Sequence, residues 1–230
     1  MRRAGKRKLR ARRPPSVAAI VARLQGAYGR RRWRPDGARG LDQLVATILS
    51  QNTNDRNSSA AYERLRGRFR SWEALRRAPV GEIERAIRGG GLARLKARRL
   101  KRIVHILGRR RGRLSLEFLR DAPLEEARRV LGELPGVGPK TVSCVLMFAF
   151  NRPVLPVDTH VHRVSLRLGL IPPGTTAEKA HALLQARTPD RLVYPFHVLL
   201  VEHGRRTCRA RRPACGCCAL ANRCFSAGRV

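Results

Sequence analysis

The chain has 230 residues and a formal net charge of +34, with 50 Lys and Arg residues against 16 Asp and Glu. Such an excess of like charge disfavours a compact chain unless a polyanion neutralises it, so nucleic acid is the expected partner and an anionic membrane surface is the weaker alternative. No apolar run approaches the ~20 residues of a membrane span, and the basic start lacks an apolar segment of the signal-peptide type. The composition therefore argues against a membrane or secreted protein and favours a cytoplasmic, nucleoid-associated one.

Apolar residues recur at helical spacing along almost the whole chain, between Gly and Pro residues that interrupt the pattern. Residues 1–13 are a basic arm that we expect to stay disordered until bound. The remaining pattern predicts helices over residues 16–28, 41–50, 54–69, 71–77, 80–88, 93–111, 123–132, 139–150, 158–168, 176–187 and 190–203. Alternating strand-like runs and a repeat of fixed period do not occur in the sequence. The sequence therefore predicts an all-α architecture.

The densest motif is LPGVGPKT, residues 134–141, which lies between two predicted helices. Gly136 and Gly138 flank Val137 and permit backbone conformations closed to other residues, so amide N–H groups are left exposed at the start of the next helix. Pro139 suits the first helical turn, where a missing N–H has no consequence. Such a turn can bind a backbone phosphate without reading base sequence. A plain corner between two helices is the structural alternative.

Lysine is rare in this chain, because only six of its 50 basic residues are lysines. Arginine cannot lose its proton, whereas a desolvated lysine can act as an amine nucleophile. Lys140 follows the glycine turn directly and has the best-defined local context of the six. It is therefore the first candidate for a reactive amine.

A second candidate lies eighteen residues after Lys140, where the sequence VDTH follows Pro156 and opens another predicted helix. Asp158 fits the N-cap of that helix, which is its structural interpretation. A carboxylate held at a helix start stays ionised, because the helix dipole and the amide donors favour the charged form, and it can balance a developing cation. His160 and His162 fit ordinary packing positions on the same helix, and nothing in the sequence supports a metal there.

Four cysteines near the end of the chain have the spacing C-x6-C-x2-C-x5-C and are Cys208, Cys215, Cys218 and Cys224. Four thiols so close together, with no sign of secretion, indicate metal ligands rather than disulfides. Zinc sites typically join two close pairs across a longer stretch, and only one close pair occurs here, so a [4Fe–4S] cluster is favoured while zinc stays the alternative. Cys217 could replace Cys218 as a ligand, although only one residue would then separate it from Cys215. Cys144 lies in an apolar run and is expected in the core.

Taken in order, LPGVGPKT, then VDTHVHR, then the cysteine spacing resemble endonuclease III and its family of helix-hairpin-helix DNA glycosylases. The resemblance covers about residues 16–225. It implies two helical domains flanking a DNA-binding cleft, a helix-hairpin-helix motif and a C-terminal iron–sulfur cluster loop. By the same resemblance, residues 33–152 form a helical barrel domain with the motif, and residues 14–32 plus 153–230 form the cluster domain.

Matched residue by residue, the resemblance implies that Lys140 is the Schiff-base lysine and that Asp158 is the catalytic aspartate. In the segment LSQNTND, which resembles the one that fills the space left by a flipped base, the usual glutamine aligns with Asn52 while Gln51 stands beside it. Leu92 aligns with a leucine that wedges into the opposite strand, although the sequence by itself favours a core position for it. The implied DNA-contact residues are Gly136, Val137, Gly138, Gln51, Asn52, Leu92 and Lys96, and the implied cluster ligands are the four spaced cysteines.

The resemblance implies a monomeric base-excision-repair enzyme that acts on double-stranded DNA with damaged bases or abasic sites. It would remove oxidised pyrimidines and cut the strand 3′ to the abasic site by β-elimination through a lysine Schiff base. The cluster loop would add phosphate contacts from Arg205, Arg206, Arg209, Arg211 and Arg212. Two rivals are a monofunctional glycosylase of the same fold, which usually lacks the lysine, and a non-enzymatic helix-hairpin-helix DNA-binding protein. The presence of both Lys140 and Asp158 disfavours the second.

Overall fold

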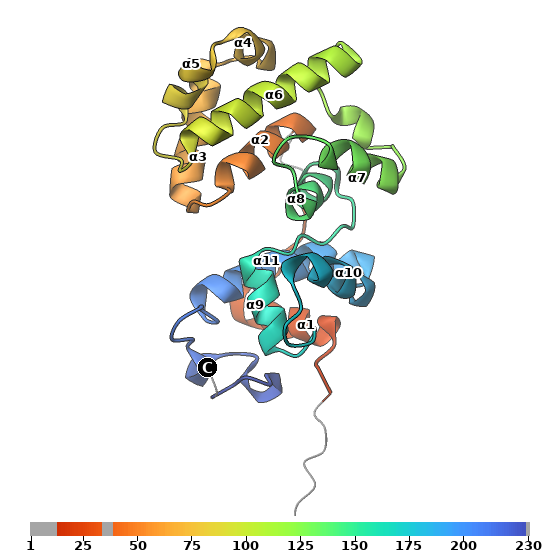
Figure 1. Ribbon diagram of the computed structural model, residues 1–230. Coiled ribbons are helices and arrows are strands. Elements are labelled where there is room, and N and C mark those ends of the chain that lie inside the picture. The colour runs from red at the N-terminus through yellow and green to blue at the C-terminus, as the bar shows by residue number, and fades with distance from the viewer. Residues whose placement is uncertain (1–12, 34–38, 229–230) are drawn as a thin grey trace, which may run out of the picture. The chain divides into compact units, whose positions relative to one another are not determined.

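The computed structural model describes residues 13–33 and 39–228, so the predicted basic arm lies outside the described residues except for Arg13. The described part of the chain contains eleven α-helices, three short 3-10 helices and no strand (Figure 1). The all-α prediction is confirmed, and every predicted helix appears within a few residues of its expected bounds.

The chain divides into two compact units. One unit comprises Arg32–Pro156, and the other comprises the described residues up to Arg31 together with those from Val157 onward. The helices of the Arg32–Pro156 unit are α2 Gly40–Ser50, α3 Asp55–Arg68, α4 Trp72–Arg77, α5 Val80–Ala86, α6 Ala93–Arg111, η1 Glu117–Leu119, α7 Leu124–Gly132 and α8 Pro139–Phe150. The helices of the other unit are α1 Val17–Tyr28, α9 Thr159–Arg167, α10 Ala177–Arg187, α11 Asp190–Arg206, η2 Cys215–Cys217 and η3 Ala221–Arg223. The assignment of these parts as a barrel domain and a cluster domain stays a prediction.

The core of the Arg32–Pro156 unit is built around α8, whose side chains are almost all buried. Helix α2 packs against α8 and contributes Leu44 and Ile48, both fully buried. Each such side chain contributes about 1.5–3 kcal/mol relative to leaving it in water. Cys144 is only 3% exposed in the middle of α8, so its predicted place in the core is confirmed. This packing holds the first turn of α8 in a fixed position.

The other unit joins the beginning of the chain to its end. Helices α1 and α9 pack against α11, with Ile20 of α1 and Leu200 of α11 both fully buried. Helix α11 continues to Arg206, three residues past the predicted end, because Gly204 does not act as a stop. A Cβ at Gly204 would lie 2.8 Å from the His160 Cβ, so this glycine instead allows α9 to approach closely.

Helix ends follow the predicted capping residues. The side chain of Ser16 accepts a hydrogen bond from the Ala19 amide at the start of α1, and Pro139 occupies the first turn of α8. Within the described ranges, no helix combines the length and the apolar character that crossing a bilayer requires.

Candidate functional site

The glycine turn between α7 and α8 adopts a conformation that requires glycine at its first position. Gly136 has φ +78°, in the left-handed region, and the Val137 amide donates to the Leu134 carbonyl at 3.1 Å. Val137 is buried and anchors the turn, while Gly138 is the N-cap of α8 and supplies no capping side chain. The first amides of α8 therefore have no side-chain acceptor, which is the arrangement an incoming anion can exploit.

Lys140 is the second residue of α8 and is partly exposed. Its neighbours Thr141 and Val142 are buried in the unit, so the backbone that carries Lys140 is well fixed. Among the residues that the structure describes, the Lys140 ammonium has no hydrogen-bond acceptor and no carboxylate partner. The amine therefore stands beside the glycine turn without a competing interaction.

Gln51, after the end of α2, is connected to the glycine turn by hydrogen bonds. Its Nε2 donates to the Gly136 carbonyl at 3.1 Å and to Thr141 Oγ1 at 3.2 Å. Its Oε1 accepts from the guanidinium of Arg99 on α6 at 3.2 Å. Of the two candidates at this position, Gln51 contacts the turn, whereas Asn52 is exposed with φ +52°.

Arg99 is a residue that sequence reasoning missed. Its side chain lies against the glycine turn, because a Cβ built on Gly136 would come within 2.6 Å of the Arg99 Cδ and Nε. In a chain with 50 basic residues, no local signal distinguishes this arginine from its neighbours. Its role follows only from the tertiary contact.

The segment before α6 lies against the segment after α2. Gly91 has φ +72°, and a Cβ added to it would lie 3.2 Å from the Asn52 carbonyl oxygen. Leu92 follows in the left-handed conformation at φ +51° and is 52% exposed, so the core position that its sequence context favoured is wrong. We call the three adjacent segments Gln51–Asn54, Gly89–Leu92 and Pro135–Gly138 the loop platform.

Lys96 does not lie on this surface. It is only 1% exposed, and its ammonium donates to the Leu49 carbonyl at 2.7 Å and to the Gly90 carbonyl at 2.8 Å. The expectation that Lys96 contacts DNA is therefore wrong, because its side chain turns inward from the first turns of α6 and is covered by the loops above it.

Asp158 lies in the other unit, where it caps α9. Its Oδ1 accepts from the Val161 amide at 2.8 Å, and the side chain is partly exposed. His162 contacts the Thr175 carbonyl at 2.8 Å through Nε2, and His160 contacts Arg163. The capping interpretation of Asp158 is confirmed, and both histidines occupy packing positions.

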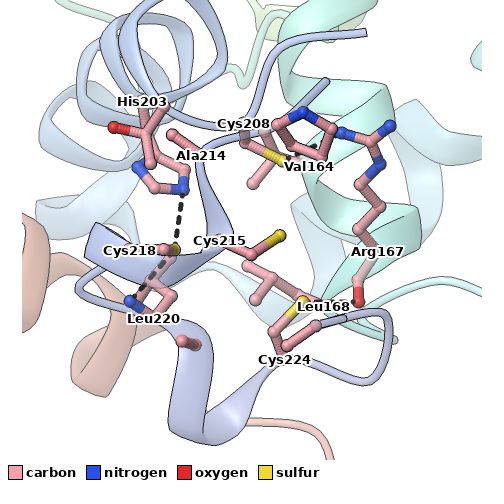
Figure 2. Close-up of a pocket in the computed structure, with 14 residues that line it drawn as sticks. Val164, Arg167, Leu168, His203, Cys208, Ala214, Cys215, Cys218, Leu220 and Cys224 are labelled. Atoms are coloured by element: carbon pink, nitrogen blue, oxygen red, sulfur yellow. Dashed lines mark hydrogen bonds between the residues drawn. The ribbon is translucent and has the colours of Figure 1, made fainter. Parts of the chain in front are cut away.

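The four spaced cysteines line one cavity of the same unit, together with apolar side chains from α9 and the C-terminal loop (Figure 2). The Cys208 thiol accepts from the Arg167 guanidinium at 3.3 Å, and the Cys218 thiol accepts from the Leu220 amide at 3.4 Å. Cys217 is exposed and does not line the cavity; its thiol points toward the Ala214 carbonyl instead. The ligand choice of Cys218 over Cys217 agrees with this placement.

Burial dominates the electrostatics of the cysteine cavity. It raises the pKa of the Cys218 and Cys224 thiols, and negative charge on the neighbouring cysteines would raise both further. Burial also lowers the pKa of His203 to about 4, so this imidazole is neutral beside Cys218, with its Nε2 at 3.7 Å from the sulfur. Four thiolates would repel one another here without a cationic group among them.

The donor set of the cavity is compatible with thiolate ligation of a metal cluster. Within the described residues, no three His, Cys, Asp or Glu side chains meet closely enough to hold a single metal ion. The four sulfurs instead surround a common space lined by Val164, Leu168 and Leu220 (Figure 2). Thiolate-only ligands and apolar surroundings are typical of iron–sulfur sites.

Comparison with known proteins gives a consistent result. Residues 45–190 match the model of the HhH-GPD superfamily of base excision DNA repair proteins. The chain is 37% identical to "Endonuclease III" of Thermotoga maritima over 181 residues, which cover 79% of this chain and 80% of that protein. It is 44% identical over 165 residues to an Arabidopsis thaliana protein whose name gives it as a candidate DNA glycosylase; this match covers 72% of the chain but spans only 56% of that relative's length.

A solved structure also resembles this one. It is titled as a non-covalent complex of endonuclease III with DNA, and it superposes with a TM-score of 0.79 at 27% identity, covering 92% of this chain and 94% of that one. The resemblance inferred from three sequence motifs is therefore confirmed over most of the chain. The chain belongs to the HhH-GPD superfamily of base excision DNA repair proteins.

Proposed function

We propose that this protein is a bifunctional DNA glycosylase and abasic-site lyase that removes oxidised pyrimidines from double-stranded DNA. The observation that carries the proposal is the unpartnered amine of Lys140, one residue inside a helix whose first amides have no side-chain cap. A phosphate bound at those amides would bring a DNA backbone to the amine. The names of its relatives, endonuclease III among them, support DNA as the partner.

Base excision requires that the damaged nucleotide leave the duplex, because its sugar C1′ is not accessible in the stack. We assign Gln51, with Asn52 beside it, to filling the vacated space, and the exposed Leu92 to wedging the opposite strand apart. Gly136, Val137 and Gly138 would hold the backbone phosphate. These groups are adjacent in the loop platform, so one surface can both stabilise the extruded base and bind the DNA backbone.

The chemical step assigned to Lys140 is attack of its neutral amine on C1′, which forms a C–N bond and expels the base. The sugar opens to an imine, loss of a proton from the adjacent C2′ follows, and the 3′ C–O bond breaks by β-elimination. Water then releases the lysine amine. We assign the Asp158 carboxylate to balancing the positive charge that develops at C1′ and on the imine nitrogen.

Cys208, Cys215, Cys218 and Cys224 would hold a [4Fe–4S] cluster that supplies cationic charge to four thiolates and fixes the loop around them. Arg205 in the last turn of α11 and the exposed loop arginines Arg209, Arg211 and Arg212 are proposed to contact phosphates. Arg206 is also exposed and pairs with Glu202 at 2.9 Å.

The test uses duplex oligonucleotides that carry thymine glycol, 5-hydroxycytosine, uracil or an abasic site, with base release and strand cleavage measured separately. We expect release of the oxidised pyrimidines and a 3′ unsaturated-aldehyde end without added base. Base release with no cleavage would assign the monofunctional reaction instead. Binding with neither product would assign a non-enzymatic DNA-binding protein.

A further inference from the structure

Lys96 is a buried cation for which the reaction has no use. It is among the large, fully buried side chains of the described residues, and its ammonium contacts two backbone carbonyls, those of Leu49 and Gly90. In the described part of the chain no carboxylate pairs with it. A buried charge without an opposite charge is costly, and burial lowers the pKa of this lysine.

The position of Lys96 on its helix adds to that cost. Helix α6 begins at Ala93, so the ammonium lies near the end of the helix whose macrodipole is positive. The first turn of α6 carries no acidic residue to offset this. The carbonyl oxygens of Leu49 and Gly90 offset only part of the cost of burying the ammonium. The function of this lysine therefore depends on the backbone segments to which these two carbonyls belong.

The two carbonyls belong to residues at or just before two loops of the platform. Leu49 lies two residues before Gln51, and Gly90 lies two residues before Leu92. The loops touch above the lysine, where Gly91 faces the Asn52 carbonyl. Each loop also contains a non-glycine residue in the left-handed conformation, Asn52 at φ +52° and Leu92 at φ +51°, a strained conformation that persists only when the surroundings fix it.

The residue type fits this task better than arginine would. A lysine ammonium is compact and can direct separate N–H bonds to two carbonyls, whereas a guanidinium is larger, planar and rigid. The site is closed, with hydrogen bonds of 2.7 and 2.8 Å. This is a physical reason for one of six lysines in a chain that otherwise uses arginine.

We propose that Lys96 is a positioning residue whose buried ammonium holds the Gln51–Asn54 and Gly89–Leu92 loops at a fixed distance from each other, so that filling and wedging occur together when a base is extruded. The inference rests on the proposed function of these loops. It predicts that Lys96 matters for reactions that require extrusion from a duplex and not for cleavage of a strand that is already open.

The same helix supplies a matched control. The ammonium of Lys101 also donates to two carbonyls, those of Arg76 and Ala78, and these lie at the end of α4 rather than in the platform. Lys101→Met removes the same kind of interaction from the same helix. It should leave the loop platform unchanged.

The experiment compares wild type, Lys96→Met, Lys96→Arg and Lys101→Met on two substrates under single-turnover conditions. One is a duplex with thymine glycol, and the other is a single strand with a preformed abasic site, which needs no extrusion. Both Lys96 variants should lose roughly 10-fold to 100-fold of the excision rate while cleaving the open strand within about twofold of wild type. Melting temperatures, and the fluorescence of 2-aminopurine opposite the lesion, are measured in parallel.

Excision by the wild-type protein tests the proposed function independently of the variants. If the wild-type protein does not excise the damaged base, the proposed function is wrong. Given an active wild type, equal losses on both substrates, or the same selective loss in Lys101→Met, would overturn the role of Lys96. Reduced 2-aminopurine fluorescence in the Lys96 variants alone supports it. If Lys96→Met does not fold, Lys96→Gln must show the same split between substrates.

Discussion

At the scale of single residues, Asp158 caps a helix and is also proposed to act in catalysis, and substitutions can separate these two functions. Its Oδ1 caps α9 through the Val161 amide, and the carboxylate charge is the feature assigned to catalysis. Asn and Ser cap helices about as well as Asp, whereas Ala does not cap them. Loss of charge and loss of the cap can therefore be compared in one position.

We predict that Asp158→Asn and Asp158→Ser retain the wild-type melting temperature within a few degrees but lose about 100-fold or more of the excision rate. Asp158→Ala should lose the same activity and also about 0.5–2 kcal/mol of stability. Thr176→Ala, which removes the cap of α10 at its bond to the Lys179 amide, is the control that loses stability alone. Wild-type excision by a folded Asp158→Asn would remove Asp158 from the mechanism.

At the scale of elements, the turn before α8 contains two glycines with different requirements. Gly136 needs its left-handed backbone and the space that Arg99 leaves it. Gly138 has φ −96°, and a Cβ there would meet nothing within 4 Å. Only an external ligand would give Gly138 a reason to lack a side chain.

Gly138→Ala is therefore predicted to leave stability unchanged or raise it slightly, by about 0.4–1 kcal/mol through the unfolded chain, and to weaken binding to duplex DNA. Gly136→Ala should lower the melting temperature, because it strains the backbone and collides with Arg99. Binding is measured at one fixed salt concentration with both variants confirmed as folded. Unchanged affinity in Gly138→Ala would show that no phosphate approaches this turn.

The cysteine loop gives a prediction about iron content that can be tested without an activity measurement. Purified protein should be coloured and contain about four irons per chain, as expected for four thiolate ligands on one loop. Ser in place of Cys208, Cys215, Cys218 or Cys224 should lower the iron content. Cys217→Ser and Cys144→Ser are matched controls that should not, and colourless protein with one zinc per chain would contradict the cluster.

The sequence predicts elements well where the determinants are local. Helix periodicity, the caps at Ser16 and Asp158 and the first-turn proline Pro139 depend on neighbours within a turn, and the structure has all of them. Leu92 is exposed because Gly91 and its own left-handed backbone set its direction, which apolar character alone does not reveal.

Lys96 and Arg99 on α6 also show that local sequence does not predict tertiary contacts. Both follow the same basic pattern in sequence, yet Lys96 is buried under the loop platform while Arg99 contacts Gln51. Lys96 reaches Leu49 at the end of α2, and Arg99 reaches Gln51 and the turn before α8. These partners lie more than 35 residues away in sequence, so only the fold brings them together.

At the scale of the whole molecule, the charge of +34 is distributed so that many arginines have no acidic partner. Arg94, Arg98 and Arg102 stand one turn apart on α6, are exposed and form no ion pair among the described residues. Like charges at this spacing repel along the helix. Neutralisation by phosphate would relieve that repulsion.

Binding to undamaged duplex should therefore weaken steeply with salt, by about 0.9 in the log–log slope for each phosphate contact. Replacing Arg94, Arg98 and Arg102 together by Gln is predicted to flatten the slope by up to about 2.7 on that scale. The preference for damaged over undamaged duplex should stay the same, because phosphate contacts do not read the base. A lost preference with an unchanged slope would mean that this face reads the lesion instead.

The central claim is that Lys140 is the nucleophile, and borohydride trapping with peptide mapping tests it most directly. The wild-type protein should form a covalent adduct with duplexes carrying an oxidised pyrimidine or an abasic site, and the mapped residue should be Lys140. Lys140→Arg keeps the charge but forms no imine, so it should bind damaged DNA without trapping or cleavage, while Lys179→Arg on α10 should behave as wild type. Trapping or full strand cleavage by a folded Lys140→Arg, or an adduct mapped elsewhere, would contradict the account.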